Sequence, residues 1–333
     1  MEPPAGVNRT VMQHRTGDPG VVAELVETPV PRPGEGELLV ELVVAPINPA
    51  EILMLQGAYG YRDTTPPLPR AAGIEGVGRV VGGATAIVPE GSLVSLAGSR
   101  GVFSDYRVIP AASALVLPPT VDPDTFAVSF VNVQAVLLML HEWPELEAGD
   151  VIIQNAGNSA YARVLDAVAS RRGFTVVNVV RSERSALSVE DELNGPVLVD
   201  GEDLDERVLA VTGGSRPRVA VDAVGGAATG RLTETLAPGG RVVTYGLLSG
   251  DPVQVDTRIV VFNGVRVEGF WMPRSMAAAP ADLLPGIAAE AMEIIAGGGF
   301  AVPIAARIGL AGIAEALALA EQGGRDGKVV VTR

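Results

Sequence analysis

Residues 151–180 hold the pattern that most restricts how this chain can fold. An apolar run, Val151-Ile152-Ile153, leads into the small residues 155–160; a helical stretch then reaches Arg172, and a second apolar run covers 175–180. This is the order of the βαβ unit in dinucleotide-binding domains. There, small residues let a pyrophosphate approach backbone N–H groups at a helix N-terminus. The sequence therefore predicts a nicotinamide dinucleotide cofactor.

The residue that ends the second strand favours NADPH over NADH. NAD-selective units carry an acidic residue there, which hydrogen-bonds the ribose hydroxyls. This chain instead has Arg181, with Arg184 three residues later. A guanidinium can pair with the 2′-phosphate of NADPH. A solvated surface arginine is the alternative interpretation of Arg181.

Composition excludes several other classes of function. The chain has no cysteine, and its two histidines, His14 and His141, lie far apart, so thiol chemistry is excluded and no metal site is expected. A formal charge of −14 argues against a nucleic-acid partner. Apolar runs such as 135–140 fall short of the roughly 20 residues of a membrane span. No apolar signal region follows Met1, so we expect a cytoplasmic protein without a membrane partner.

Two domains are expected from a length of 333 residues. Up to a boundary near residue 120, short runs separated by Gly and Pro predict an antiparallel, β-rich unit. Beyond it, strands alternate with helices. We expect strands at 21–30, 38–44, 76–81, 93–96, 105–109, 151–154, 176–180, 197–199, 219–224, 241–245 and 265–270. Their alternation predicts an α/β fold with a doubly wound parallel sheet of about six strands, and the terminal run 328–332 is expected to rejoin the β-rich domain.

Seven short motifs then reveal a family resemblance. In their order and spacing they resemble medium-chain dehydrogenase/reductases and, among these, the mitochondrial-type 2-enoyl thioester reductases. The motifs are residues 45–51, Gln56-Gly57-Ala58-Tyr59, 73–78, 154–159, 224–226, 243–246 and 269–271. The resemblance implies a GroES-like catalytic domain of residues 1–121 and 273–333 and an NADP-binding Rossmann domain of residues 122–272. It also implies a homodimer and a place in fatty acid metabolism.

Gly73-Ile74-Glu75 separates this chain from the zinc alcohol dehydrogenases of the superfamily. Those enzymes have a histidine ligand between the Gly and the Glu, whereas this chain has Ile74 and lacks the cysteine ligands as well. Alcohol oxidation on zinc is therefore disfavoured. Hydride transfer to a conjugated acceptor remains, and an α,β-unsaturated thioester is such an acceptor, because hydride at Cβ gives an enolate that is protonated at Cα.

Tyr59 resembles the active-site tyrosine of the enoyl reductases. A phenol is protonated at neutral pH, so it can hydrogen-bond to the developing enolate or deliver its proton. The alternative is that Tyr59 is a loop aromatic packed on its neighbours, with Tyr61 nearby in sequence. Gly60 stands where a proline commonly follows the tyrosine, and we expect it to make this loop more mobile.

The resemblance also implies the residues that contact NADPH. Asn158 and Ser159 suit the N-cap of the helix that meets the pyrophosphate. Trp271 could wall the nicotinamide or acyl pocket, or be a core aromatic. The full set of implied contacts is Asn132, Asn158, Ser159, Ala160, Tyr161, Arg181, Ser182, Glu183, Tyr245, Gly246, Leu247, Leu248, Phe270, Trp271, Met272 and Lys328.

Two departures from the family pattern lie in this set or beside it. Tyr161-Ala162 replaces small residues and a glycine, so the helix must pack with an extra methyl and a phenol. The stretch Asn132-Val133-Gln134-Ala135-Val136 lacks the family's Pro, Thr and Tyr, which puts the substrate-side polarity in doubt. An altered substrate is therefore one reading.

The sequence leaves four functions open. The first is NADPH-dependent reduction of 2-enoyl thioesters, carried by coenzyme A or by an acyl carrier protein. The second is a zinc-free quinone or enone reductase. A reductase of one biosynthetic intermediate is a variant of either. A non-catalytic nucleotide-binding protein is the fourth.

Overall fold

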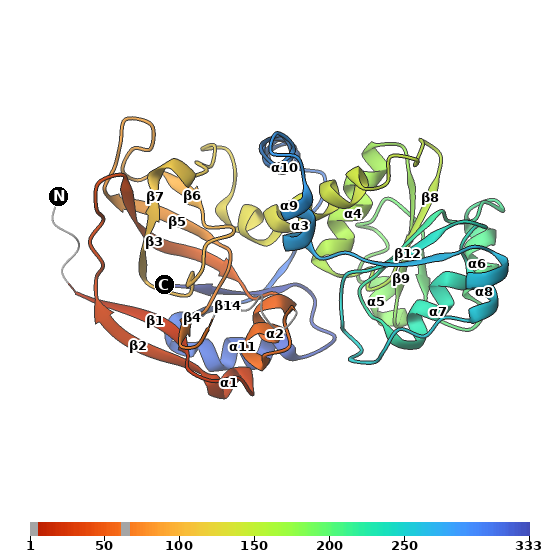
Figure 1. Cartoon of the computed structure of the whole chain (residues 1–333), viewed down its shortest axis with the longest axis horizontal. Helices are drawn as coiled ribbons and strands as arrows, with labels where there is room; N and C mark the ends of the chain where they lie inside the picture. The colour runs from red at the N-terminus through yellow and green to blue at the C-terminus, as the bar shows by residue number, and fades with distance from the viewer. Residues whose placement is uncertain (1–5, 61–66) are drawn as a thin grey trace. The chain divides into compact units, whose positions relative to one another are not determined.

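The computed structural model describes residues 6–60 and 67–333, which form two compact units (Figure 1). The first unit combines residues 1–131 and 302–333, and the second covers residues 132–301. The sequence predicted the boundaries at 121 and 272 instead. Residues 122–131 belong by their contacts to the first unit, and residues 273–301, which include helix α10 (Leu283–Gly297), belong to the second.

The first unit is built on two β-sheets. In the smaller one, β1 (Val7–Gln13) lies between β2 (Ala23–Pro29) and the two-residue β4 (Arg70–Ala71), both antiparallel to it. The larger sheet contains β14 (Ile304–Gly309), β15 (Lys328–Thr332), β3 (Glu37–Pro46), β5 (Val77–Gly82) and β6 (Leu93–Ser95) in that order, and β7 (Tyr106–Pro110) also pairs with β3. The terminal strand β15 thus rejoins the β-rich unit, as predicted.

Apolar side chains from both sheets form the core of this unit together with its helices. Leu38, Phe103 and Val329 are completely buried in it. Short helices complete the unit: α1 (Pro19–Val22), α2 (Pro49–Gln56), α11 (Ile313–Glu321) and the 3-10 turns η1 (Ala111–Ser113) and η2 (Leu310–Gly312).

Strand prediction was wrong at the start of β2. We expected residues 21–30 to be extended, but Val21 and Val22 lie in helix α1. The Asp18 side chain accepts a hydrogen bond from Gly20 N–H at 2.9 Å, and Pro19 occupies the first helical position. A capped start of this kind overrides the β preference of two valines.

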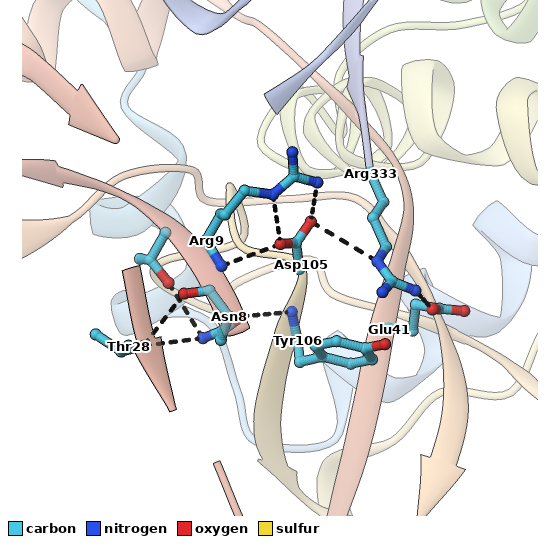
Figure 2. A network of polar contacts seen from close by, with 8 residues as sticks. Asn8, Arg9, Thr28, Glu41, Asp105, Tyr106 and Arg333 are labelled. Carbon is cyan, nitrogen blue, oxygen red and sulfur yellow. Dashed lines mark hydrogen bonds and ion pairs between the residues drawn. The ribbon is translucent and has the colours of Figure 1, made fainter. Parts of the chain in front are cut away.

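A network of polar contacts around Asp105 includes Arg9, near the N-terminal end of the first unit, and Arg333, at its C-terminal end (Figure 2). Arg9 donates to Asp105 from its backbone N–H at 3.0 Å and from its guanidinium twice at 2.8 Å, while Asp105 is only 2% exposed. Arg333 pairs with Glu41, and its guanidinium lies 4.4 Å from the ring centroid of Tyr106. These contacts connect β1 and the residue after β15 to Asp105, which directly precedes β7.

The second unit is a six-stranded parallel sheet with helices between its strands. The strand order is β10 (Val197–Val199), β9 (Thr175–Val180), β8 (Val151–Gln154), β11 (Val219–Asp222), β12 (Arg241–Thr244) and β13 (Arg266–Gly269), with every neighbouring pair parallel. This is the Rossmann order. The α/β prediction and the six strands are confirmed.

The helices of this unit connect consecutive strands or follow the last one. They are α4 (Ala160–Arg171), α5 (Glu183–Leu187), α6 (Leu204–Val211), α7 (Gly226–Glu234), α8 (Thr257–Phe262), α9 (Met272–Ala278) and α10. The remaining helix, α3 (Pro123–His141), begins in the first unit and ends in the second.

Helix α3 is long and apolar enough, by length and composition alone, to cross a membrane. About two thirds of its apolar window, 67%, is buried inside the protein. A buried core helix passes the same test, so this is weak support for a membrane span.

Candidate active site

The turn after β8 has the geometry of a phosphate-binding loop. Ala156 has a φ of 49°, which is rare for a residue with a Cβ and is typical of functional turns. Gly157 N–H donates to the Val179 carbonyl at 2.9 Å, and a Cβ on Gly157 would lie 3.2 Å from that oxygen. Gly157 therefore lets the turn lie close against β9.

Ser159 is the N-cap of α4, as predicted. Its hydroxyl accepts a hydrogen bond from Ala162 N–H at 3.1 Å. The other N–H groups of the first turn of a helix have no intrahelical acceptor, and the helix dipole adds partial positive charge there. The start of α4, with Asn158, Ser159 and Ala160, can thus receive a pyrophosphate.

A carboxylate at the end of β11 organises the neighbouring loops. Asp222 is completely buried and accepts five hydrogen bonds. The donors are Asn155 Nδ2 at 2.6 Å, Val224 N–H at 2.9 Å, Gly225 N–H at 3.0 Å, Thr229 Oγ1 at 2.7 Å and Thr244 Oγ1 at 3.1 Å. No sequence pattern predicted a role for Asp222. An acid at the end of an apolar strand, just before Ala-Val-Gly-Gly, was the signal available.

The phenol of Tyr161 is accommodated inside the second unit. Its ring centroid lies 4.3 Å from that of Tyr245, and its hydroxyl donates to Met139 Sδ on α3 at 2.8 Å. Tyr161 is 6% exposed, and burial raises its pKa. The extra bulk that the sequence shows at this position is therefore packed against α3 and β12.

Tyr245 connects the end of β12 to the phosphate turn. Burial raises its pKa, and a hydrogen bond with Ser159 partly opposes that rise. Gly246 follows where no side chain fits, because a Cβ would lie 2.4 Å from the Ala223 carbonyl oxygen. Leu247 and Leu248 are exposed, at 62% and 57%.

Arg181 follows β9 and is exposed. Among residues 6–60 and 67–333, no hydrogen bond or ion pair engages its guanidinium. Ser182 caps α5 by accepting from Ser185 N–H at 3.3 Å, and Glu183 is exposed. An unpaired guanidinium here is available for the 2′-phosphate of NADPH, and this role stays a prediction.

The predicted cofactor contacts of the second unit gather mostly at one edge of its sheet. The turn 156–161, residues 181–183, residues 245–248 and Phe270-Trp271-Met272 follow the carboxyl ends of β8, β9, β12 and β13. Ligands of doubly wound folds bind at this edge. Asn132 lies on α3, and Lys328 and Tyr59 belong to the first unit.

Tyr59 lies in the loop after α2 and is half-buried. The end of this helix is firmly held: Gln13 Nε2 donates to the Leu55 carbonyl at 2.9 Å, and Arg70 donates to the Met54 carbonyl at 2.6 Å. Gly57 has a φ of 80°, and a Cβ there would lie 2.7 Å from Thr16 Cγ2. Tyr59 therefore follows a helix end that is held in place. Gly60, directly after Tyr59, has a φ of 76°. Tyr61 lies outside the described residues.

A buried charged cluster lies at the other end of α2, and we call its members Asn48, Glu51, Glu75 and Lys328 the α2 cluster. Lys328 Nζ donates to Asn48 Oδ1, Asn48 Nδ2 donates to Glu75, and Asn48 N–H donates to Glu51 Oε2 at 2.9 Å. The antiparallel register of β15 and β3 brings Lys328 opposite Asn48. Glu51 and Glu75 are only 2% and 4% exposed, whereas Asn48 and Lys328 are half-buried.

Burial dominates the ionisation of the α2 cluster. It raises the pKa of Glu51 to about 8, with repulsion from Glu75 as a second cause. It raises the pKa of Glu75 to about 7 against the opposing effects of Lys328 and Asn48. It lowers the pKa of Lys328, which the two carboxylates partly oppose. Of these four residues, only Lys328 was predicted to be functional; acids inside the apolar stretches 50–55 and 72–77 were the available signal.

Among the described residues, no group of three or more His, Asp or Glu side chains could hold a metal ion. Ile74, next to Glu75, offers no ligand.

Family models and relatives agree with this architecture. An alcohol dehydrogenase GroES-like domain matches residues 34–119, and a zinc-binding dehydrogenase model matches residues 162–289. The mitochondrial enoyl-[acyl-carrier-protein] reductases of Bos taurus and Homo sapiens are 31% and 30% identical over 277 residues, which is 81% of this chain and 73% of each relative.

Solved structures share the fold over nearly the whole chain. The Etr1p complex with NADP and crotonyl-CoA has a TM-score of 0.84 at 19% identity, and Escherichia coli quinone oxidoreductase with NADPH has 0.82 at 24% identity. Both comparisons cover 98% of this chain and 100% of the other.

The chain therefore belongs to the medium-chain dehydrogenase/reductase superfamily and is an oxidoreductase. Within that superfamily it is homologous to the mitochondrial enoyl-[acyl-carrier-protein] reductases.

Proposed function

We propose that this protein uses NADPH to reduce the C=C bond of 2-enoyl thioesters. The proposal is supported by homology, at 31% identity, to a mitochondrial enoyl-[acyl-carrier-protein] reductase. It is also supported by Tyr59, which is half-buried and follows the anchored end of α2. The position of Tyr59 after an anchored helix end is the observation that carries the proposal, because reduction of a conjugated acceptor needs a positioned proton donor. Among the described residues, no group of side chains could hold a metal ion in place of that donor.

The second unit fits NADPH at the carboxyl edge of its sheet. The start of α4 would hold the pyrophosphate, Arg181 would pair with the 2′-phosphate, and the Tyr245 to Leu248 segment would line the nicotinamide end. NADPH supplies the hydride, which adds to Cβ. Tyr59 then hydrogen-bonds to the thioester enolate and delivers its proton to Cα.

Turnover of crotonyl-CoA by wild type and by Tyr59→Phe tests this function. The phenylalanine keeps the ring and removes the proton, so we expect kcat to fall by about 10²-fold or more while NADPH affinity stays within about twofold. NADPH affinity follows from nicotinamide fluorescence. Turnover of a small quinone but of no enoyl thioester would assign the rival quinone reductase activity instead, and absence of NADPH binding would favour a non-catalytic protein.

We also propose a homodimer formed through β13. This strand ends the sheet, and Val267 on it is 47% exposed. On the adjoining helix α8, Val261 and Phe262 are 64% and 79% exposed. An apolar sheet edge of this kind is suited to pairing with a second copy. Light scattering should give a dimer mass for wild type and a monomer mass for Val267→Glu; a monomeric wild type would contradict this.

Enoyl thioesters occur on coenzyme A and on carrier proteins, and the homology to enoyl-[acyl-carrier-protein] reductases supports a role in fatty acid metabolism. Comparing kcat/KM for one acyl chain on both carriers decides which carrier this protein uses.

A further inference from the structure

Gln13, the last residue of β1, is 1% exposed and lies against the C-terminal end of α2. Its Nε2 donates to the Leu55 carbonyl at 2.9 Å and to the Met54 carbonyl at 3.3 Å. The same nitrogen donates to the Arg15 carbonyl at 3.0 Å, and Gln13 Oε1 accepts from Arg70 Nε at 2.8 Å. One buried amide therefore connects β1, the loop after β1, β4 and α2.

The turn that ends α2 directly precedes Tyr59. The last carbonyls of a helix have no donor within the helix, so the groups that bond them determine how the chain leaves it. Ala58 N–H donates to the Leu53 carbonyl at 2.8 Å, and Gly57 N–H donates at 3.2 Å to the carbonyl after it. With Gly57 in the left-handed region at a φ of 80°, these two bonds form a Schellman motif. The backbone direction at Tyr59 is therefore set by the end of α2.

The Leu55 carbonyl, in the last turn of α2, is bonded from outside the helix. It accepts from Gln13 Nε2 and, at 3.1 Å, from Gly17 N–H. Both donors belong to the segment that begins at the end of β1, so this segment fixes the end of α2 relative to the smaller sheet. Leu55 is only 2% exposed, and loss of the amide donor in such a site costs free energy that water does not easily restore.

We propose that Gln13 is a positioning residue for Tyr59 in the reduction of the thioester; this rests on the proposed function. Gln13 holds the end of α2, and Tyr59 is the second residue after the glycine that ends this helix. A proton donor must lie within hydrogen-bond reach of the enolate, and a displacement of about 1 Å can cost about 10²-fold in rate. Gln13 belongs to the first unit, whereas the predicted pyrophosphate site belongs to the second, so Gln13 acts on turnover and not on NADPH binding.

Amide hydrogen exchange tests the anchoring without any activity. In Gln13→Met, which replaces the amide with an apolar side chain of similar length, the N–H groups of Gly57 and Ala58 should exchange about 10-fold faster or more than in the wild-type protein. Unchanged exchange at both positions overturns the inference. This readout stays valid even if the protein reduces no enoyl thioester, an outcome that would defeat the proposed function separately.

Steady-state kinetics of Gln13→Met separate positioning from cofactor binding. We expect kcat for crotonyl-CoA to fall by about 10-fold or more while the KM for NADPH changes less than about twofold. A wild-type kcat in this variant overturns the proposal. A rise in the KM for NADPH with an unchanged kcat also overturns it, because that result assigns Gln13 to the binding of the cofactor.

Asn8→Leu is the matched control for general destabilisation. Asn8 is a second buried amide on β1, 6% exposed, and its Oδ1 accepts from Tyr106 N–H at 2.8 Å while its Nδ2 points to Thr28 on β2. We expect Asn8→Leu to lower the free energy of unfolding about as much as Gln13→Met but to keep kcat within about twofold of wild type. An equal fall of kcat in both variants would assign the effect to lost stability and overturn the proposal.

Gln13→Glu keeps the test decisive if the methionine variant does not fold. It has nearly the size of glutamine and keeps an oxygen that can accept from Arg70, but when ionised it cannot donate to the carbonyls of α2. At about pH 8 we expect the same fall in kcat of about 10-fold or more. A wild-type kcat in Gln13→Glu at this pH overturns the proposal, because it shows that the reaction does not need the hydrogen bond from residue 13 to Leu55.

Discussion

The two units solve the burial of acidic groups in opposite ways. In the second unit, the buried Asp222 stays satisfied by five donors from backbone, amide and hydroxyl groups. In the first unit, Glu51 and Glu75 share one lysine and one asparagine, and burial raises both pKa values. Full hydrogen bonding holds a buried carboxylate in a fixed place, whereas incomplete pairing leaves burial to raise the pKa of the carboxyl groups.

Removing the Asp222 carboxylate should have the largest effect on the free energy of unfolding. Asp222→Ala leaves five donors without their acceptor in a buried site, so we expect a loss of about 4 to 5 kcal/mol in the free energy of unfolding. Urea unfolding measures it, with the exposed Asp251→Ala as the matched control. A loss no larger than that of the control would mean that Asp222 does not hold this edge of the sheet.

Removing Lys328, the cation of the α2 cluster, should cause the next largest loss in the free energy of unfolding. That loss should depend on pH. Lys328→Met removes the positive charge that lowers the pKa of both buried carboxyls, so its cost should grow as pH rises and the carboxyls of the wild-type protein ionise. We expect a loss of about 3 kcal/mol at pH 8 and a smaller one at pH 6, measured by urea unfolding. Exposed Arg15→Met is the control. A loss that is the same at both pH values would contradict the raised pKa values of Glu51 and Glu75.

Arg181→Ala tests the predicted contact between the second unit and the 2′-phosphate of NADPH. Loss of a charge-assisted contact with the 2′-phosphate should weaken NADPH by about 1.5 to 3 kcal/mol and leave NADH nearly unchanged. Fluorescence titration with both coenzymes gives the two affinities, and Arg32→Ala, at an exposed arginine of the first unit, serves as a control. Equal losses for NADPH and NADH would remove the 2′-phosphate role.

Counted per pH unit, the change in the pH dependence of stability should be the smallest effect. The folded chain retains protons on Glu51 and Glu75 that the unfolded chain releases near pH 4.5, so these groups make stability fall as pH rises from there to about 8. Each retained proton contributes a slope of up to about 1.4 kcal/mol per pH unit. Glu51→Gln should reduce that slope and keep the capping hydrogen bond, whereas exposed Glu24→Gln should not; an identical slope in Glu51→Gln would refute the raised pKa.

The sequence predicted the second unit better than the first because backbone patterns specify it. Apolar runs of four to six residues, separated by helices, mark β8, β9, β11 and β12, and their parallel order follows from the connections. In the first unit, β4 has only two residues and carries no periodic signal, and α1 depends on one capping aspartate. The strand β14 was not predicted at all.

The candidate site divides in the same way. Ser159 and the turn after β8 could be predicted because local sequence fixes a capped helix start. The α2 cluster could not, since Asn48 and Lys328 meet only through the pairing of β3 with β15, across 280 residues of sequence. Likewise, the packing of Tyr161 on Tyr245 and Met139 depends on three separate elements.

Initial rates of NADPH oxidation with crotonyl-CoA, for wild type beside Tyr59→Phe, measure the proposed chemistry most directly. The account predicts steady turnover by the wild-type protein and a fall of about 10²-fold or more in the variant with NADPH still bound. Equal rates for the two proteins, or no rate with any enoyl thioester, would contradict it.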